Sequence, residues 1–207
     1  MLEAKVDRRT DFHEVQDQGP FKTCLSYATS AVHRINKNIE YSLSAEALHY
    51  TASEGGFRTG CNMMEIQEAL FETGQPERHH CEEITMQNHL QWSPPSGVEY
   101  YQSDSSFENA SIEVVQRLIQ EGRYPILGIA ITDKFRDPEP PWVLYPGEIV
   151  GRHAVVGVGL GEFNGNPVIL VRNSWGSEWA DSGYAWLDRS FLEDHLEGLL
   201  LVNRGED

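Results

Sequence analysis

The spacing of apolar residues changes halfway along this chain, and this change limits the folds that the chain can adopt. In the first half, apolar residues recur every three or four positions, as at Leu25, Ala28 and Val32, which is typical of amphipathic helices. In the second half they occur in short runs separated by Gly, Pro, Asn and Asp, which is typical of strands. The sequence therefore predicts an α+β fold, with a helical part followed by a β part.

Helix-capping signals predict where several helices of the first half begin. Ser44 is placed to cap a short helix that follows it. Asn62 and Glu65 have the spacing of a capping box, and Gly74 is a suitable stop for the helix that they begin. A further apolar stripe at helical spacing covers residues 112–119.

Five short apolar runs predict strands in the second half, at residues 125–131, 153–159, 168–171, 184–187 and 199–202. The Pro-rich segment 137–141 is expected to be a loop rather than a linker, because strands continue after it. We therefore expect a single domain over residues 1–207, with a mainly helical lobe over 1–107 and a mainly β lobe over 108–207. A cleft between two such lobes is a common place for a site.

The charge of the chain excludes some classes of function. The 207 residues include 32 acidic and 16 basic side chains, which gives a formal net charge of -16. Such a surface repels phosphate backbones, so we expect no nucleic-acid partner. No apolar stretch reaches the roughly 18 residues of a membrane span, and the N-terminus lacks the apolar core of a signal peptide. We therefore expect no membrane partner and a cytoplasmic location.

The cysteines favour a reducing compartment. The chain has only Cys24, Cys61 and Cys81, and an odd, small number argues against a disulfide framework. We expect three free thiols, with a Cys61–Cys81 bridge as the alternative.

A histidine-rich segment raises the question of a metal site. His79, His80 and Cys81 are adjacent, and His89 follows. Their spacing fits no strong zinc pattern, and adjacent histidines are expected to point in different directions. We therefore predict no metal and no cofactor.

Cys24 has the surroundings expected of a cysteine nucleophile. It begins a helical stripe directly after a turn at Gly19 and Pro20. A thiol at a helix N-terminus faces the positive end of the helix dipole, which favours the thiolate. Gln18 lies across the turn, where its amide could reach an oxyanion.

Four segments together resemble the papain-like cysteine peptidases. Residues 18–24 read Gln-Gly-Pro-Phe-Lys-Thr-Cys, similar to the Gln-Gly-x-x-x-x-Cys segment of that family. Residues 153–155 look like its His-Ala-Val strand, residues 173–179 like its Asn-Ser-Trp-Gly-x-x-Trp motif, and residues 183–184 match the Gly-Tyr that follows. His153 and Asn173 lie 129 and 149 residues after Cys24, and the family places both about 130–150 residues downstream.

The resemblance implies a fold and a role for each matching residue. The fold would be papain-like, with a helical N-terminal lobe, an antiparallel β C-terminal lobe and the active-site cleft between them. Cys24 would attack a carbonyl carbon, and His153 would take the thiol proton and later protonate the leaving amine. Asn173 would hold the ring of His153, with Trp175 covering that hydrogen bond and contacting substrate. The Gln18 side chain and the Cys24 backbone N–H would form the oxyanion hole.

The chain departs from the family pattern beside the nucleophile. Phe21 replaces the first cysteine of the usual Cys-Gly-Ser-Cys-Trp, which leaves Cys61 without its usual partner. Lys22 replaces the glycine at the cleft edge, where it would narrow the cleft or add a positive charge. Leu25 replaces the Trp, so the helix would pack differently.

Further departures concern the substrate-binding positions. Met64 stands where the family has a glycine whose backbone binds the substrate residue two before the cut. Ile129 and Ala154 match the apolar pocket for that residue, which implies an apolar preference.

The predicted function is hydrolysis of peptide bonds by a Cys-His-Asn triad through an acyl-enzyme. The alternatives are an isopeptidase, amidase or acyltransferase with the same nucleophile, and a papain-fold binding module with little catalysis. The partners that the resemblance implies are a polypeptide substrate and a protein inhibitor or regulator. Because Met1 stands almost at the usual mature start of the family, either a preceding segment has been removed or the enzyme is controlled by its location, a partner or the shape of its target.

Overall fold

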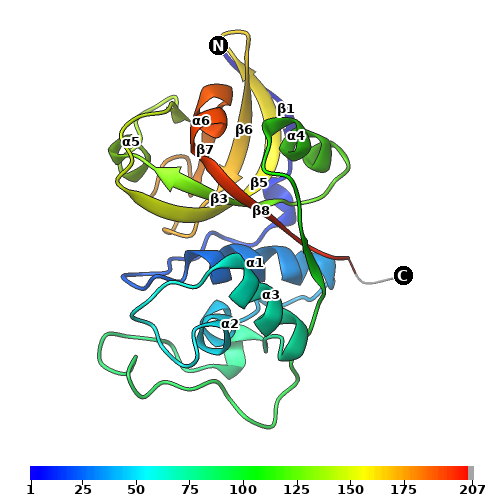
Figure 1. Cartoon of the computed structure of the whole chain (residues 1–207), viewed down its shortest axis with the longest axis vertical. Coiled ribbons are helices and arrows are strands. Elements are labelled where there is room, and N and C mark those ends of the chain that lie inside the picture. The colour runs from blue at the N-terminus through cyan, green and yellow to red at the C-terminus, as the bar shows by residue number, and fades with distance from the viewer. Residues whose placement is uncertain (205–207) are drawn as a thin grey trace. The chain divides into compact units, whose positions relative to one another are not determined.

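The computed structural model describes residues 1–204 (Figure 1). The chain forms two compact units. Within the described residues, the β unit consists of Met1–Asp17 and Phe107–Leu201, and the helical unit consists of Gln18–Ser106 with residues 202–204. The first 17 residues therefore group with the sheet, whereas the predicted helical lobe, residues 1–107, includes them.

The helical unit contains three α-helices and one 3-10 turn. They are α1 (Cys24–Asn36), α2 (Ala45–Ala52), α3 (Met63–Glu72) and η2 (Arg78–His80). The predicted caps are present: the Ser44 side chain accepts from the backbone N–H of Ala47, and Asn62 and Glu65 form a complete capping box. Each cap satisfies N–H groups that have no partner inside the helix.

Two kinds of contact stabilise the helical unit. One is an aromatic-rich cluster that contains Phe21, Phe57 and Trp92, in which the rings of Phe57 and Trp92 meet edge to face with their centroids 5.4 Å apart. The other is a buried polar chain in which Ser30 donates to Gln75 at 2.5 Å and Gln75 donates to His33 Nδ1 at 2.8 Å. Buried polar groups of this kind are costly unless they are hydrogen-bonded.

The β unit contains most of the strands. Its elements are β1 (Leu2–Asp7), η1 (Arg9–Asp11), α4 (Ile112–Gln120), β3 (Ile126–Ile131), α5 (Asp133–Arg136), β4 (Val143–Leu144), β5 (Gly151–Phe163), β6 (Asn166–Arg172), β7 (Tyr184–Asp188), α6 (Arg189–His195) and β8 (Leu196–Val202). A short strand, β2 (Ser105–Phe107), lies where the chain passes from the helical unit to the β unit.

The sheet runs in the order β2-β8-β3-β5-β6-β7-β4, and β1 pairs with β5. Among β1 and β3 to β8 the strand pairs are antiparallel except β4 and β7, which are parallel. Glycine is required at position 159, because a Cβ atom there would lie 2.4 Å from the carbonyl oxygen of Val6 on β1. The long central strand β5 carries His153, directly opposite Ile129 on β3.

A hydrophobic core fixes the helices of the β unit on this sheet. The apolar stripe of α4 contributes Ile112, Val115, Leu118 and Ile119. Phe135 of α5 and Phe191 of α6 are fully buried in the same cluster, and each such side chain contributes about 1.5–3 kcal/mol by its burial. No helix in residues 1–204 is long and apolar enough to cross a membrane.

Candidate active site

The turn at Gly19 and Pro20 leads directly into α1 and places Cys24 at its first position. Gly19 adopts φ +60°, a conformation that glycine reaches without strain. Cys24 is the first residue of α1 and is partly exposed, and the first turn of the helix contains no acidic side chain. The helix dipole therefore acts on the thiol without a neighbouring carboxylate in that turn, which favours the thiolate.

Gln18 is held at the entry to this helix. Its side chain is 8% exposed, and its Nε2 donates to the carbonyl oxygen of Phe21 at 2.6 Å. The hydrogen bond spans the turn and fixes the carboxamide beside the segment that carries Cys24. A fixed donor costs less reorganisation when charge develops nearby.

The other two thiols differ from Cys24 in their surroundings. Cys61 Sγ lies 3.5 Å from His49 Nδ1 and 3.8 Å from Ser26 Oγ, and burial raises the pKa of Cys61 to about 11. Burial also raises the pKa of Cys81. Both groups are therefore thiols near neutral pH and poor nucleophiles. None of the three cysteines, all within the described part of the chain, is in a disulfide bond.

In the β unit, His153 and Asn173 form a directed pair. His153 is 6% exposed, and its Nε2 lies 2.6 Å from Asn173 Oδ1. The backbone N–H of Ser174 donates to the same oxygen at 2.8 Å. Because this backbone group can only donate, the Asn173 atom that faces it must be the oxygen, and His153 Nε2 must carry the hydrogen. The neutral ring of His153 is then left with Nδ1 as a proton acceptor.

Aromatic side chains cover this pair. The Trp175 ring lies 4.5 Å from the His153 ring at an interplanar angle of 36°, and Phe135 meets His153 edge to face at 5.7 Å. Trp179 donates its indole N–H to the carbonyl oxygen of Phe135 at 3.0 Å, which fixes the cluster. The role of Trp175 as a cover is consistent with this stacking. Phe135 was missed by the sequence reasoning, although Thr132, which caps α5, stands three residues before it.

Burial and hydrogen bonding act on the imidazole in opposite directions. Burial lowers the pKa of His153 to about 4, while the hydrogen bond to Asn173 opposes this shift. An imidazolium in this environment therefore needs a nearby negative charge.

Arg172 is a second residue that the sequence reasoning missed. It is 7% exposed, and its Nη2 donates to the carbonyl oxygens of His13 at 3.3 Å and Glu14 at 2.9 Å. Its guanidinium also lies over the Phe12 ring, 5.4 Å from the centroid. The residue before Asn173 thus ties the N-terminal segment to the end of β6. The sequence signal that could have identified Arg172 is a basic residue at the end of an apolar strand.

The residues predicted to contact substrate fall into two groups. Lys22 is exposed and Met64 is 70% exposed, both in the helical unit. The backbone N–H of Met64 donates to Asn62 Oδ1 at 2.9 Å, so the α3 cap uses that donor. Ile129 and Ala154 are buried in the β unit, and Ile129 packs in its hydrophobic core at 1% exposed. A substrate-binding role for these four residues stays a prediction.

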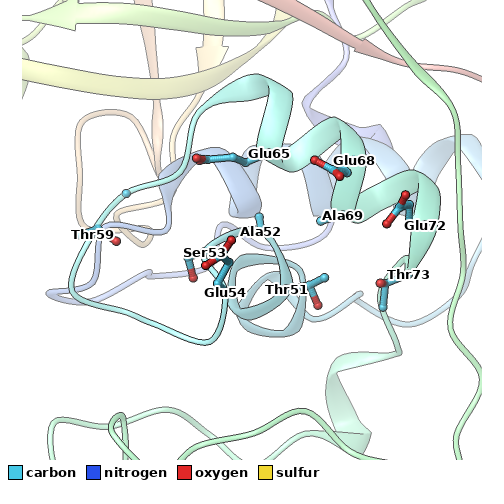
Figure 2. Close-up of a pocket in the computed structure, with 11 residues that line it drawn as sticks. Thr51, Ala52, Ser53, Glu54, Thr59, Glu65, Glu68, Ala69, Glu72 and Thr73 are labelled. Carbon is cyan, nitrogen blue, oxygen red and sulfur yellow. The ribbon is translucent and has the colours of Figure 1, made fainter.

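A separate hollow of about 480 Å³ lies in the helical unit beside α3. Figure 2 shows Glu65, Glu68 and Glu72 along α3, with Glu54 across the hollow from them. Its lining contains no cysteine and no histidine, so it offers neither the thiol nor the imidazole of a cysteine peptidase. Potential metal ligands converge at another place in the same unit, at residues 77–80.

Comparison with known proteins gives the same family over nearly the whole chain. The model of the papain family cysteine proteases matches residues 2–195. Cysteine protease XCP2 of Arabidopsis thaliana is 26% identical over 211 residues, which cover 92% of this chain and 55% of that protein. Pro-cathepsin H of Mus musculus is 51% identical over 37 residues, which cover 18% of this chain and 11% of that protein. The matched region thus spans about half the length of XCP2 and a small part of pro-cathepsin H.

Solved structures show the same fold. Xylellain, a cysteine protease from Xylella fastidiosa, superposes with a TM-score of 0.84 at 16% identity, over 100% of this chain and 88% of that one. Procathepsin L 3 from the larval midgut of Tenebrio molitor gives a TM-score of 0.76 at 19% identity, over 95% and 68%. The predicted papain-like α+β fold is therefore confirmed. With a family match over residues 2–195, this chain belongs to the papain family of cysteine proteases.

Proposed function

We propose that the chain hydrolyses peptide bonds with Cys24 as nucleophile, His153 as base and acid, and Asn173 as the residue that orients His153. The observation that carries this proposal is the direction of the His153–Asn173 hydrogen bond. It assigns the hydrogen to Nε2 and leaves Nδ1 able to accept the proton of a thiol.

The proposed reaction has two halves. The Cys24 thiol proton moves to His153 Nδ1, and the thiolate attacks the carbonyl carbon. The Gln18 amide and the Cys24 backbone N–H stabilise the oxyanion that forms. The C–N bond breaks as His153 gives its proton to the leaving amine, which leaves a thioester on Cys24. Water then loses a proton to His153, attacks the thioester and releases the acid with the thiol restored.

The charges make the first step feasible. Burial holds the pKa of a lone His153 near 4. A contact between a thiolate and an imidazolium contributes about 4 kcal/mol at a separation of about 4 Å and an effective dielectric constant of about 20. This corresponds to about three pKa units, which is enough to charge His153 near neutral pH. The helix dipole at Cys24 favours the same ion pair.

Labelling by an epoxysuccinyl inhibitor tests this function. We expect one inhibitor to attach per chain, at Cys24, and Cys24→Ala to abolish the attachment. Cys61→Ala and Cys81→Ala are matched controls that should label like the parent, because their raised pKa values make these thiols unreactive. The absence of labelling in a folded, reduced chain would count against every function in which Cys24 is a nucleophile. It would favour a papain-fold binding module with little catalysis.

The class of amide is a separate question. A polypeptide is the substrate that we propose. The exposed Lys22 and Met64, and the use of the Met64 amide in the α3 cap, give reason to test other acyl groups. A panel of fluorogenic peptides, ubiquitin-like conjugates and small amides would separate the two. Cleavage of conjugates or amides with no cleavage of peptides would favour the isopeptidase or amidase.

A further inference from the structure

A carboxylate and two imidazoles converge in the helical unit, outside the proposed catalytic residues. Among the described residues, ligand atoms of Glu77, His79 and His80 all lie within 4.8 Å of one another. Glu77 Oε2 is 3.4 Å from His79 Nδ1 and 4.0 Å from His80 Nε2. All three side chains retain access to solvent. The proposed peptidase reaction gives them no role.

The 3-10 turn explains how two adjacent histidines reach the same carboxylate. The backbone N–H of His80 donates to the carbonyl oxygen of Glu77 at 3.1 Å, so the chain turns tightly at this point. The two imidazole centroids are 4.0 Å apart. The expectation that adjacent histidines point in different directions is therefore wrong for this pair. Cys81 and His89, the other residues of the histidine-rich segment, are not in the cluster.

Contacts with neighbouring residues fix Glu77. Its backbone forms a β-bridge with Leu43, and its Oε1 accepts a hydrogen bond from the Tyr101 hydroxyl at 3.4 Å. Oε2 is thereby turned toward the two imidazoles. The His79 ring in turn packs edge to face against Tyr41 at 5.1 Å. The carboxylate and one imidazole are thus held in place by contacts outside the cluster.

We propose that Glu77 Oε2, His79 Nδ1 and His80 Nε2 bind one zinc ion. Zinc takes nitrogen and carboxylate ligands at about 2.0–2.2 Å in a tetrahedral arrangement, so its ligand atoms lie about 3.3–3.6 Å apart. The Glu77–His79 distance already matches this spacing, and His80 needs only a small rotation of its side chain. Water fills the fourth position. The chain's net charge of -16 attracts cations to its surface.

Zinc at this place would hold a long irregular segment. Residues 81–104 contain no helix or strand, and they begin directly after His80. Tyr101, near the end of this segment, contacts the Glu77 side chain and pairs with Gln75. The ion would therefore fix the start of the segment, and the Glu77 side chain that it holds also contacts Tyr101 near the end, so zinc would stabilise the helical unit.

Protonation offers another explanation for the same contacts. An imidazolium beside a carboxylate gives similar distances without a metal. The neighbouring charges are mixed: Arg78 pairs with Glu46, and the Tyr101 hydroxyl also contacts Glu99. A direct measurement of zinc binding above the ordinary pKa of imidazole separates the two explanations.

Calorimetric titration of the full chain with zinc chloride tests the proposal. All samples carry Cys24→Ala, so that zinc bound by the reactive thiol is not counted. We expect one zinc ion per chain, and His79→Ala and His80→Ala should each weaken binding by at least about tenfold. His89→Ala is the matched control and should bind like its parent. Magnesium should not bind, because imidazole ligands suit zinc and not magnesium.

Two further readouts locate the ion. Zinc should shift the ¹⁵N resonances of His79 Nδ1 and His80 Nε2, and should raise the unfolding temperature of the parent but not of the two variants. The absence of stoichiometric zinc binding would overturn the proposal. So would equal binding by the parent, His79→Ala and His80→Ala. Both histidines are substantially exposed, so these substitutions should not prevent folding.

Discussion

At the scale of single residues, the backbone N–H of Ser174 determines which ring nitrogen of His153 carries the hydrogen. It fixes which end of the Asn173 amide faces the imidazole, and therefore which ring nitrogen can accept a proton. The Trp175 ring lies against the same imidazole, tilted by 36°. The orientation of the His153 ring thus depends on backbone geometry, which the short motif of residues 173–175 encodes locally.

Asn173→Ala tests this orientation. The substitution removes the oxygen that holds His153 Nε2, so the ring can rotate and present the wrong nitrogen. We expect kcat/KM for a peptide substrate to fall by about 10²-fold, because misplacing a catalytic group by about 1 Å can cost that much. Asn109→Ala, at an exposed loop position, is the control and should retain full activity. Full activity in Asn173→Ala would refute the orienting role.

At the scale of elements, the cap of α3 connects the stability of the helix with the exposed surface at Met64. The Asn62 side chain accepts hydrogen bonds from the backbone N–H groups of Met64 and Glu65, and the Asn62 backbone N–H donates to the Glu65 carboxylate. This reciprocal cap sets the first turn of α3, where Met64 is exposed.

Asn62→Ala should lower the free energy of unfolding by about 1 kcal/mol, because it leaves two helix N–H groups without their side-chain acceptor. Urea unfolding followed by circular dichroism measures the change. Glu68→Ala on the same helix is the matched control, and as an exposed substitution it should change stability by less than about 0.5 kcal/mol. Equal effects of the two substitutions would show that the cap does not stabilise α3.

Local signals explain which elements could be predicted from the sequence. The caps at Ser44 and Asn62 act within three residues, so the sequence reveals them directly. β1 was missed because its strand character depends on pairing with β5, far along the chain. β4 was missed for the same reason, since two residues that pair in parallel with β7 have no pattern of their own.

The same distinction applies to the candidate site. Gln18, Cys24, His153 and Asn173 were found because they stand in short motifs at characteristic spacing. Phe135 and Arg172 were missed because their roles depend on contacts with residues distant in sequence, such as Trp179 and Glu14. No metal was predicted at His79 and His80, because two adjacent histidines in a sequence do not reveal the path of the backbone at η2.

At the scale of the whole molecule, a buried histidine makes stability depend on pH. Burial lowers the pKa of His33 to about 4, and its Nδ1 accepts a hydrogen bond from Gln75. The unfolded chain has an ordinary histidine with a pKa of about 6.5. Between these values the unfolded state binds more protons, so the stability that neutral His33 gives is complete above about pH 6.5 and falls toward pH 4.

His33→Gln should reduce this acid sensitivity. The full linkage for one group shifted by about 2.5 units is about 3 kcal/mol. We expect the free energy of unfolding of the parent to fall more steeply than that of His33→Gln between about pH 6.5 and pH 4. His89→Gln, which replaces a partly exposed histidine, is the control and should follow the parent. Identical slopes in the parent and His33→Gln would contradict the assignment.

The proposed ion pair of Cys24 and His153 is tested most directly by the pH dependence of Cys24 alkylation. The rate of reaction with iodoacetamide, with the site identified by peptide mass, follows the amount of thiolate. We predict that the parent reacts rapidly well below the ordinary thiol pKa of about 8.5, and that His153→Ala loses this reactivity and titrates like a simple thiol. Equal profiles for the parent and His153→Ala would contradict the ion pair.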